Sequence, residues 1–285
     1  MDEASLTQML NPTTRDALVE RVRFYRDLGL TEFYRRPVDA AMLAAEADEA
    51  QSVAAEAEVE PAVSQSNVFE EEPAISARKS IAAPPEIAAA VPAMDRAAAL
   101  QMIRDEIGDC TRCALHKGRN KIVFADGDPN ARLMFVGEGP GADEDAQGLP
   151  FVGRAGQLLN NMIAAMGLTR EQVYIANVVK CRPPGNRTPE PDEANTCTPF
   201  LFRQIDVVRP QVLVALGATA ATYLLGHRQP LAGLRGRVHA FRGTQLIVTY
   251  HPAFLLRDPR QKKEAWADLQ IAMKELGLKK PASGS

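Results

Sequence analysis

The sequence predicts an α/β fold of three layers, in which helices cover both faces of a central, mainly parallel, four-stranded sheet. Two observations predict it. From Met94 onward, short apolar runs alternate with longer segments of helical periodicity, which is the pattern of parallel strands joined by crossover helices. The short runs are also apolar along their whole length, as expected for strands that are buried on both faces. A mostly disordered N-terminal extension is predicted to precede this domain.

The predicted strands are short, and most of their residues are apolar. They are Leu133–Val136, Val173–Val179, Val212–Leu216 and Leu246–Tyr250. The predicted helices have apolar side chains on one face and begin or end at recognisable stop and start signals, such as Gly167 after the first of them. They are Gln157–Met166, Pro191–Val208, Ala218–Leu225 and Gln261–Leu276.

Composition divides the chain into three parts. Residues 1–39 are predicted as a short helical segment, because apolar side chains recur at three- to four-residue spacing between Thr14 and Arg36. This helix either docks on the main domain or binds a protein partner, and the sequence leaves both alternatives open. Residues 40–92 are rich in Ala, Glu, Pro, Ser and Val, so they are predicted to be a disordered linker. Residues 93–285 are predicted to form the one large domain.

Charge separates the extension from the domain. Residues 1–92 carry 17 Asp and Glu against 8 Lys and Arg, a net charge of −9, whereas the remainder of the chain has 19 acidic and 25 basic residues, a net charge of +6. A basic domain fits an anionic partner such as nucleic acid. No run of eighteen apolar residues and no signal peptide are visible, so we expect a cytoplasmic monomer without a membrane span.

The four cysteines of the chain predict one metal site. Cys110 and Cys113 form a Cys-x-x-Cys pair. Between Cys113 and Cys181 lie 67 residues, and fifteen residues lie between Cys181 and Cys197. In a cytosolic chain such a set indicates metal binding rather than disulfides. Zinc usually takes its ligands from two compact knuckles, and the second pair is not one, so the spacing favours an iron–sulfur cluster over zinc by a small margin.

A glycine loop follows the first predicted strand. Residues Gly137-Glu-Gly-Pro-Gly-Ala142 match the relaxed dinucleotide-binding pattern G-x-G-x-x-A. That pattern has to open a helix directly, and we expect no helix in the acidic stretch Asp143–Pro150 that follows. Its carboxylates would also repel a pyrophosphate. The loop is therefore not predicted to bind a nucleotide cofactor.

Unusual residues lie near the carboxyl ends of the predicted strands. The glycine loop follows the first strand, Asn177 lies in the second with Cys181 beyond it, and His251 follows the fourth. Ligands of open α/β sheets bind beyond the carboxyl ends of the strands. The sequence therefore predicts an active site at this edge.

Four motifs in order carry a family resemblance. They read Gly137-Glu-Gly-Pro-Gly141, Leu149-Pro-Phe-Val-Gly-Arg-Ala-Gly156, Asn177-Val-Val-Lys-Cys-Arg-Pro-Pro-Gly-Asn-Arg187 and His251-Pro-Ala-Phe-Leu-Leu-Arg257. With the cysteine spacing, the chain from Cys110 to Leu276 resembles the iron–sulfur-containing family 4 uracil-DNA glycosylases. The resemblance implies the uracil-DNA glycosylase-like fold and a [4Fe-4S] cluster on Cys110, Cys113, Cys181 and Cys197.

The resemblance also implies how the base is bound. A flipped base needs an aromatic face and polar groups for its Watson–Crick edge. Phe151 could stack on uracil, and the Asn177 amide could donate to O4 and accept from N3–H. Gly139 belongs to the loop beside the base, and Glu144 is placed by the resemblance against the C5 edge, where it would help to reject thymine. The alternatives are a core phenylalanine, a loop-tying asparagine and a solvated acidic loop.

Catalytic and DNA-binding roles follow from the same motifs. Glu138 is the candidate for holding the attacking water, with Asn186 as a second polar group, and His251 is the candidate donor to O2 of the departing uracil. Arg257 would contact phosphate. Either of two leucines could fill the gap left by the flipped base, or they could instead begin the packing of the last helix. These are Leu255 and Leu256.

We therefore expect a monofunctional glycosylase that hydrolyses the N-glycosidic bond of uracil in single- or double-stranded DNA and leaves an abasic site for base excision repair. No lysine nucleophile is apparent in the motifs, so no strand cleavage is expected. One rival is a non-catalytic iron–sulfur nucleic-acid-binding or replication accessory protein, against which Glu138, Asn177 and His251 argue. A covalent-trapping relative would need a histidine in the loop after Cys181, which has none.

Overall fold

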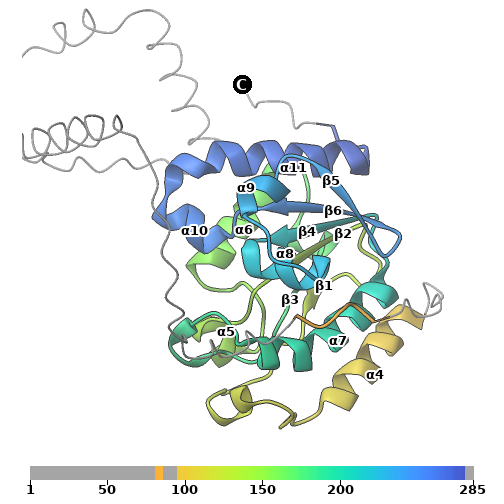
Figure 1. Cartoon of the computed structure of the whole chain (residues 1–285). Helices are drawn as coiled ribbons and strands as arrows, with labels where there is room; N and C mark the ends of the chain where they lie inside the picture. The colour runs from red at the N-terminus through yellow and green to blue at the C-terminus, as the bar shows by residue number, and fades with distance from the viewer. Residues whose placement is uncertain (1–80, 86–94, 280–285) are drawn as a thin grey trace, which may run out of the picture. The chain divides into compact units, whose positions relative to one another are not determined.

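The computed structural model describes residues 81–85 and 95–279, which include all four motifs (Figure 1). The helix predicted between Thr14 and Arg36 lies outside the described residues. Within them, no helix has the length and apolar character that crossing a membrane requires.

The domain alternates helices and strands. The strands are β1 Asp126–Gly127, β2 Leu133–Gly137, β3 Tyr174–Asn177, β4 Val212–Leu216, β5 Val238–Phe241 and β6 Thr244–Thr249. The α-helices are α4 Arg96–Ile107, α5 Ala142–Gln147, α6 Arg154–Ala165, α7 Pro191–Val208, α8 Ala218–Leu225, α9 Leu231–Leu234, α10 Pro252–Arg257 and α11 Lys262–Leu276. Short 3-10 turns include Pro184–Asn186 and Pro259–Gln261.

The sheet has six strands rather than the four that the sequence predicts. Its order is β1-β3-β2-β4-β6-β5. The four predicted strands form the parallel centre, so the three-layer, mainly parallel prediction is confirmed. The two additional strands, β1 and β5, pair antiparallel at the two edges. Both are short and largely exposed to solvent, so they lack the apolar run that identifies a buried strand.

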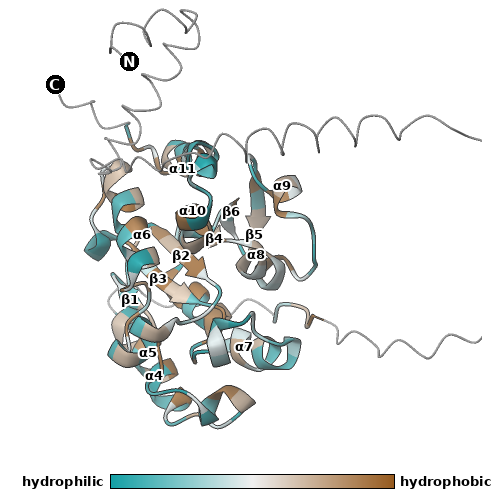
Figure 2. Cartoon of the chain, turned by 90° about the vertical axis from the view of Figure 1, so that its left-hand side faces the viewer, coloured by the Kyte–Doolittle hydropathy of each residue, from teal (hydrophilic) through white to brown (hydrophobic). Residues whose placement is uncertain are grey.

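Successive residues of the central strands enter two separate cores. Met134 and Val136 of β2 face the core under α4, α7 and α8, whereas Leu133 and Phe135 face the core under α6, α10 and α11. This two-residue alternation is the geometry of a pleated strand. The sheet lies between α11 and α7 in Figure 1, and β2 and β3 are brown in Figure 2, as expected for strands buried on both faces.

A segment inside the predicted linker contacts the domain. Residues 81–85 are extended; the Ala82 amide donates to Asn195 Oδ1 of α7 at 3.1 Å, and the Arg242 guanidinium donates to the Pro85 carbonyl. Ile81 packs against the apolar core. Residues 81–85, which the sequence assigns to the linker, therefore pack on the domain.

Candidate active site and cysteine pocket

The carboxyl ends of β2 and β3 bring three site residues together. Gly137 ends β2 and is paired in register with Asn177, which ends β3. A Cβ atom built on Gly137 would lie 2.4 Å from Asn177 Oδ1 and 2.6 Å from Phe151 Cζ. Only glycine at position 137 leaves room for both side chains. The Asn177 amide and the Phe151 ring therefore both pack against the backbone of Gly137.

Asn177 is buried, with 2% of its surface exposed, and its Oδ1 atom has no hydrogen-bond partner. Buried amide oxygens are normally paired, and one that is not marks either strain or a missing ligand. The main chain of Asn177 is held in place, because Lys180 Nζ donates to its carbonyl oxygen at 3.0 Å and to Gln204 Oε1 at 2.5 Å. The main chain that carries the amide is therefore held, while the side-chain acceptor has no partner within the protein.

Phe151 occupies a constrained turn. Its φ of 52° lies in the left-handed region, which is uncommon for a bulky residue. Arg170 holds this turn: its guanidinium donates to the carbonyl oxygens of Pro150 at 2.6 Å and Phe151 at 3.1 Å. A Cβ atom on Gly156 would lie 1.9 Å from the Phe151 carbonyl oxygen. The helix α6 thus packs directly on the backbone that aims the Phe151 ring.

The acidic stretch after the glycine loop is helical, contrary to the prediction. The helix α5 begins at Ala142, and Glu144 in its first turn accepts hydrogen bonds from the amides of Gly141, Val152 and Gly153 at 2.9–3.0 Å. The absence of a helix is thus not an argument against a nucleotide. Within the glycine loop, the Gly141 amide already donates to Glu144 and is not free for a phosphate. The Glu144 carboxylate joins the glycine loop to the turn that carries Phe151.

His251 precedes α10 and caps it. Its Nδ1 atom accepts from the Ala253 amide at 3.1 Å, so the proton of the neutral ring lies on Nε2. Burial, reinforced by the positive charge of Arg257, lowers the pKa of His251 to about 4. The ring lies 5.5 Å from the ring of Phe151, centroid to centroid. The imidazole is therefore a neutral donor beside the aromatic face.

Glu138 lies directly after β2 and is bonded to a residue that the sequence did not indicate. Thr219, in the first turn of α8, donates its hydroxyl to Glu138 Oε2 at 2.5 Å. The turn before it, at Gly217, lies beside His251, since a Cβ atom built on Gly217 would be 3.1 Å from His251 Cβ. The junction of β4 and α8 therefore borders both predicted catalytic side chains.

Other predicted site residues lie differently. Gly139 is in the glycine loop, against Val179. Asn186 is exposed, in the turn after Cys181, and its Oδ1 accepts from Arg182 Nε at 2.8 Å. Leu255 is 1% exposed and belongs to the core between α6 and α11, a position that favours the packing alternative for this leucine. Leu256 is half-buried and Arg257 is exposed.

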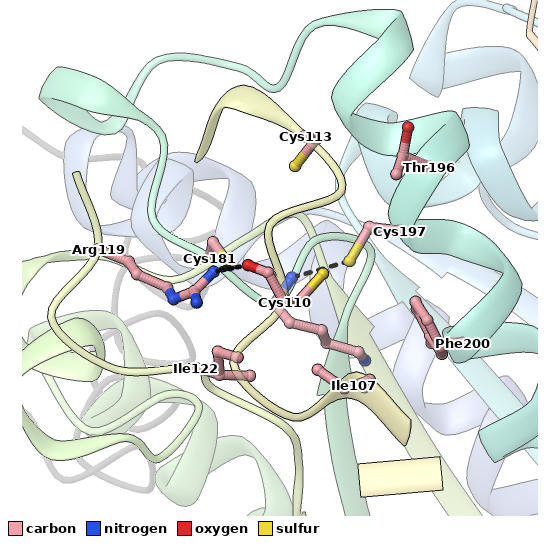
Figure 3. Close-up of a pocket in the computed structure, with 10 residues that line it drawn as sticks. Ile107, Cys110, Cys113, Arg119, Ile122, Cys181, Thr196, Cys197 and Phe200 are labelled. Atoms are coloured by element: carbon pink, nitrogen blue, oxygen red, sulfur yellow. Dashed lines mark hydrogen bonds between the residues drawn. The ribbon is translucent and has the colours of Figure 1, made fainter. Parts of the chain in front are cut away.

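The four cysteines surround one pocket, although they come from distant parts of the chain (Figure 3). Cys110 and Cys113 lie in the loop after α4, Cys181 lies beyond β3, and Cys197 lies within α7. All four are free thiols. The remaining lining is half apolar, with Ile107, Ile122 and Phe200, and half polar, with Arg119, Lys180 and Thr196.

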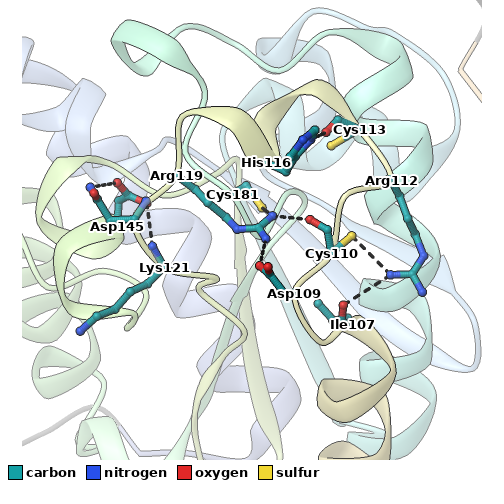
Figure 4. A network of polar contacts seen from close by, with 11 residues as sticks. Ile107, Asp109, Cys110, Arg112, Cys113, His116, Arg119, Lys121, Asp145 and Cys181 are labelled. Atoms are coloured by element: carbon teal, nitrogen blue, oxygen red, sulfur yellow. Dashed lines mark hydrogen bonds and ion pairs between the residues drawn. The ribbon is translucent and has the colours of Figure 1, made fainter.

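Nitrogen donors point at three of the sulfurs. Arg112 donates to Cys110 Sγ at 3.3 Å, Arg119 to Cys181 Sγ at 3.5 Å, and the Lys180 amide to Cys197 Sγ at 3.3 Å. Figure 4 shows the two arginines on this rim; Arg119 also bonds the Cys110 carbonyl. Such donors favour sulfur atoms that carry negative charge.

Burial raises the pKa of the Cys181 thiol, and it raises the pKa of Cys197 to about 11. These groups hold their protons at neutral pH unless a metal displaces them. In the described part of the chain, no three His, Cys, Asp or Glu side chains are arranged to hold one metal ion.

The acidic helix is tied to the cysteine loop. Asp145 of α5 is fully buried and accepts from the amide of Asn120 at 2.8 Å, from its side chain at 2.6 Å, and from the Lys121 amide at 3.3 Å (Figure 4). The alternative of a solvated acidic loop therefore does not hold for Asp145. Its carboxylate connects the loop after Cys113 to the glycine loop of the site.

Four residues of the site escaped the sequence analysis. Gly137 could have been found, because a glycine at the end of a buried strand indicates close approach of another group. The other three depend on burial or on contacts with residues that are distant in the sequence, and no local sequence pattern indicates such contacts. They are Thr219, Arg170 and Lys180.

Comparison with known proteins agrees with this geometry. Residues 124–270 match the model of the uracil DNA glycosylase superfamily. A type-4 uracil-DNA glycosylase from Thermotoga maritima is 45% identical over 161 residues, which are 56% of this chain and 84% of the relative. A type-4 enzyme from Archaeoglobus fulgidus is 41% identical over 184 residues, or 62% of this chain and 92% of the relative. One from Sulfurisphaera tokodaii is 44% identical over 173 residues, covering 58% and 79%. With the match to the superfamily model spanning half of its length, the chain belongs to the type-4 uracil-DNA glycosylases.

Proposed function

We propose that this protein removes uracil from DNA by hydrolysing the N-glycosidic bond and leaves an abasic site. The observation that carries the proposal is the buried Asn177 amide, whose Oδ1 has no partner and which meets the Phe151 ring over Gly137. A flat base with both an acceptor and an N–H on one edge completes this arrangement.

Asn177 reads the edge of the base. Its Nδ2 donates to O4 of uracil, and its Oδ1 accepts from N3–H. Cytosine presents the opposite pattern, with an amino donor in place of O4 and a bare N3 acceptor. An amide that could rotate would accept both bases, so selectivity requires a fixed orientation. The buried setting of Asn177 and the anchoring of its carbonyl by Lys180 supply this fixation.

Glu138 and His251 act on opposite ends of the breaking bond. As the C1′–N1 bond breaks, its electron pair goes to the uracil ring, and the sugar develops oxocarbenium character. The Glu138 carboxylate stabilises that cation and takes a proton from the water whose oxygen bonds to C1′. Charge grows on O2 of uracil, to which His251 donates from Nε2. Because the pKa of His251 is lowered to about 4, it acts as a neutral donor.

The remaining predicted residues support substrate binding. Glu144 holds the turn of Phe151 rather than standing free. Because Gly139 has no side chain, the glycine loop can lie close to the bound base. Leu256 and Arg257, on the face of α10 that is not fully buried, are proposed to contact the DNA around the flipped nucleotide, and Asn186 to assist in ordering water.

We infer that Cys110, Cys113, Cys181 and Cys197 hold a [4Fe-4S] cluster. Four free thiols around one pocket, with nitrogen donors aimed at their sulfurs, support this inference. The cluster would join the loop after α4 to β3 and α7, so its contribution is to the stability of the fold that carries Asn177.

The test is direct. The purified protein is incubated with an oligonucleotide that contains one uracil, and alkali then cleaves any abasic site; a thymine oligonucleotide of the same sequence is the control. Excision of uracil alone is expected, and Glu138→Gln, made in parallel, should lose it. Activity that survives unchanged in Glu138→Gln would point to a contaminating glycosylase and would leave the proposal unsupported.

A further inference from the structure

The Glu138 carboxylate has an unusual setting for a group that must meet developing positive charge. Thr219 Oγ1 donates to its Oε2 atom at 2.5 Å. Within residues 81–85 and 95–279, no lysine, arginine or histidine forms an ion pair with it. A neutral hydroxyl orients a carboxylate without cancelling its charge, whereas a guanidinium would do both. The negative charge of Glu138 therefore remains available to the sugar.

The position of Thr219 on α8 frees its hydroxyl for this contact. Threonines within helices commonly donate to the carbonyl four residues earlier, as Thr196 and Thr198 of α7 do at 2.6 Å and 2.5 Å. Thr219 lies in the first turn of α8, and its hydroxyl reaches across the sheet edge to a residue 81 positions away. The hydrogen bond therefore joins α8 to the residue that follows β2, instead of pairing with a carbonyl group of its own chain segment.

The same junction borders His251. Gly217, the N-cap of α8, lies against the Cβ atom of His251, so one short segment between β4 and α8 touches both proposed catalytic residues. The start of α8 therefore joins the side of the site that would hold the water to the side that would hold the leaving group.

We propose that Thr219 is a positioning residue for excision. It fixes Oε2 of Glu138 and leaves Oε1 to hold the attacking water. This inference rests on the proposed glycosylase activity and adds a residue that acts through Glu138 without touching DNA.

The experiment compares Thr219→Val, Thr219→Ser and Thr222→Val in the full chain. Valine keeps the shape of threonine and removes the hydroxyl, serine keeps the hydroxyl, and Thr222 is a buried residue one turn further along α8, which controls for valine in this helix. The readouts are the single-turnover excision rate and the affinity for uracil DNA. Thr219→Val should slow excision about tenfold, as expected when a reacting group loses its alignment, with unchanged DNA affinity. Thr219→Ser and Thr222→Val should stay within about twofold of the wild type.

A double mutant separates positioning from general weakening. If Thr219 acts only through Glu138, Thr219→Val should add almost nothing to the loss in Glu138→Gln, because coupled residues are not additive. Three results would overturn the proposal: a wild-type rate in Thr219→Val, failure of serine to restore the rate, or full additivity in the double mutant. If valine prevents folding, Thr219→Ala, which also removes the hydroxyl, takes its place in both comparisons, with the same results expected. A wild-type protein that excises no uracil would instead refute the proposed function.

Discussion

Replacing His251 by asparagine separates its two roles. In the structure, Nδ1 caps α10 through the Ala253 amide, and Nε2 is the proposed donor to uracil O2. The oxygen of an asparagine side chain can take the place of Nδ1, and no atom then reaches the place of Nε2. Removing one such donor from an active site costs about 2.7–4 kcal/mol in the barrier, or about 10²–10³ in rate. His251→Asn should therefore lose excision to that extent and keep its thermal stability.

His251→Ala is the matched comparison, because it loses the cap as well. Losing an N-cap costs about 1 kcal/mol, which lowers Tm by about 2–4 °C in a domain of this size. Both variants should excise equally slowly in single-turnover assays, and only the alanine variant should melt earlier. An asparagine variant that excises uracil at the wild-type rate would refute the assignment of Nε2.

The lowered pKa of His251 gives a second test on the same variants. Unfolding exposes the imidazole, whose pKa returns from about 4 to 6.5. Between these values the unfolded chain binds a proton that the folded chain does not, so this contribution to stability is complete above pH 6.5 and is lost as the pH falls to about 4. It amounts to about 3 kcal/mol. Denaturant titrations should show a steeper loss of stability on acidification in the wild type than in His251→Asn. The excision rate should show no inflection near pH 6.5.

Asn177→Asp places a carboxylate against O4 of uracil and should raise the barrier to uracil excision by about 2–4 kcal/mol. The variant should also gain weak excision of cytosine. Equal rates of uracil excision in the variant and the wild type would instead support the loop-tying role of Asn177. Protein purified without oxygen should be brown and contain about four irons per chain, and Cys181→Ala should lower stability first; a fully active preparation with zinc and no iron would contradict the cluster. Proteins that begin at Lys79 and at Met94 should both excise uracil at a rate within about tenfold of the full chain, but the shorter one should melt earlier because it lacks Ile81 and its neighbours. Equal melting temperatures would show that this segment contributes nothing.

The sequence predicted the centre of the fold because the centre is chemically uniform. The strands β2 and β4 are apolar on every residue, and such runs, too short for a helix and bounded by glycine, indicate buried strands. The edge strand β5 has mostly exposed residues, and its pairing with β6 is decided by contacts along the chain rather than by composition. The helix α5 was missed because three acidic residues in its first turn suggested solvent, whereas they face the positive end of the helix and main-chain amides.

The candidate site was predicted where residue type carries the chemistry. An asparagine within an apolar strand and a histidine after another are visible in the sequence, and the structure places both at the same edge of the sheet. Thr219 and Arg170 could not be identified, for the opposite reason. A threonine at the start of a helix and an arginine in a 3-10 turn are common, and their roles arise only from the residues that they contact.

The five residues from Asn177 to Cys181 have a consequence for cells that are short of iron. One end of this segment is the proposed reader of the base, and the other is a proposed ligand of the cluster. Lys180 lies between them: its side chain donates to the Asn177 carbonyl, and its amide donates to the sulfur of a further proposed ligand, Cys197. Loss of the cluster would therefore make the Asn177 side chain more mobile, in addition to destabilising the fold. Protein stripped by a chelator and kept in the cold should bind DNA yet discriminate uracil from cytosine less well than the loaded protein. Iron supply would then set the accuracy of repair as well as its amount.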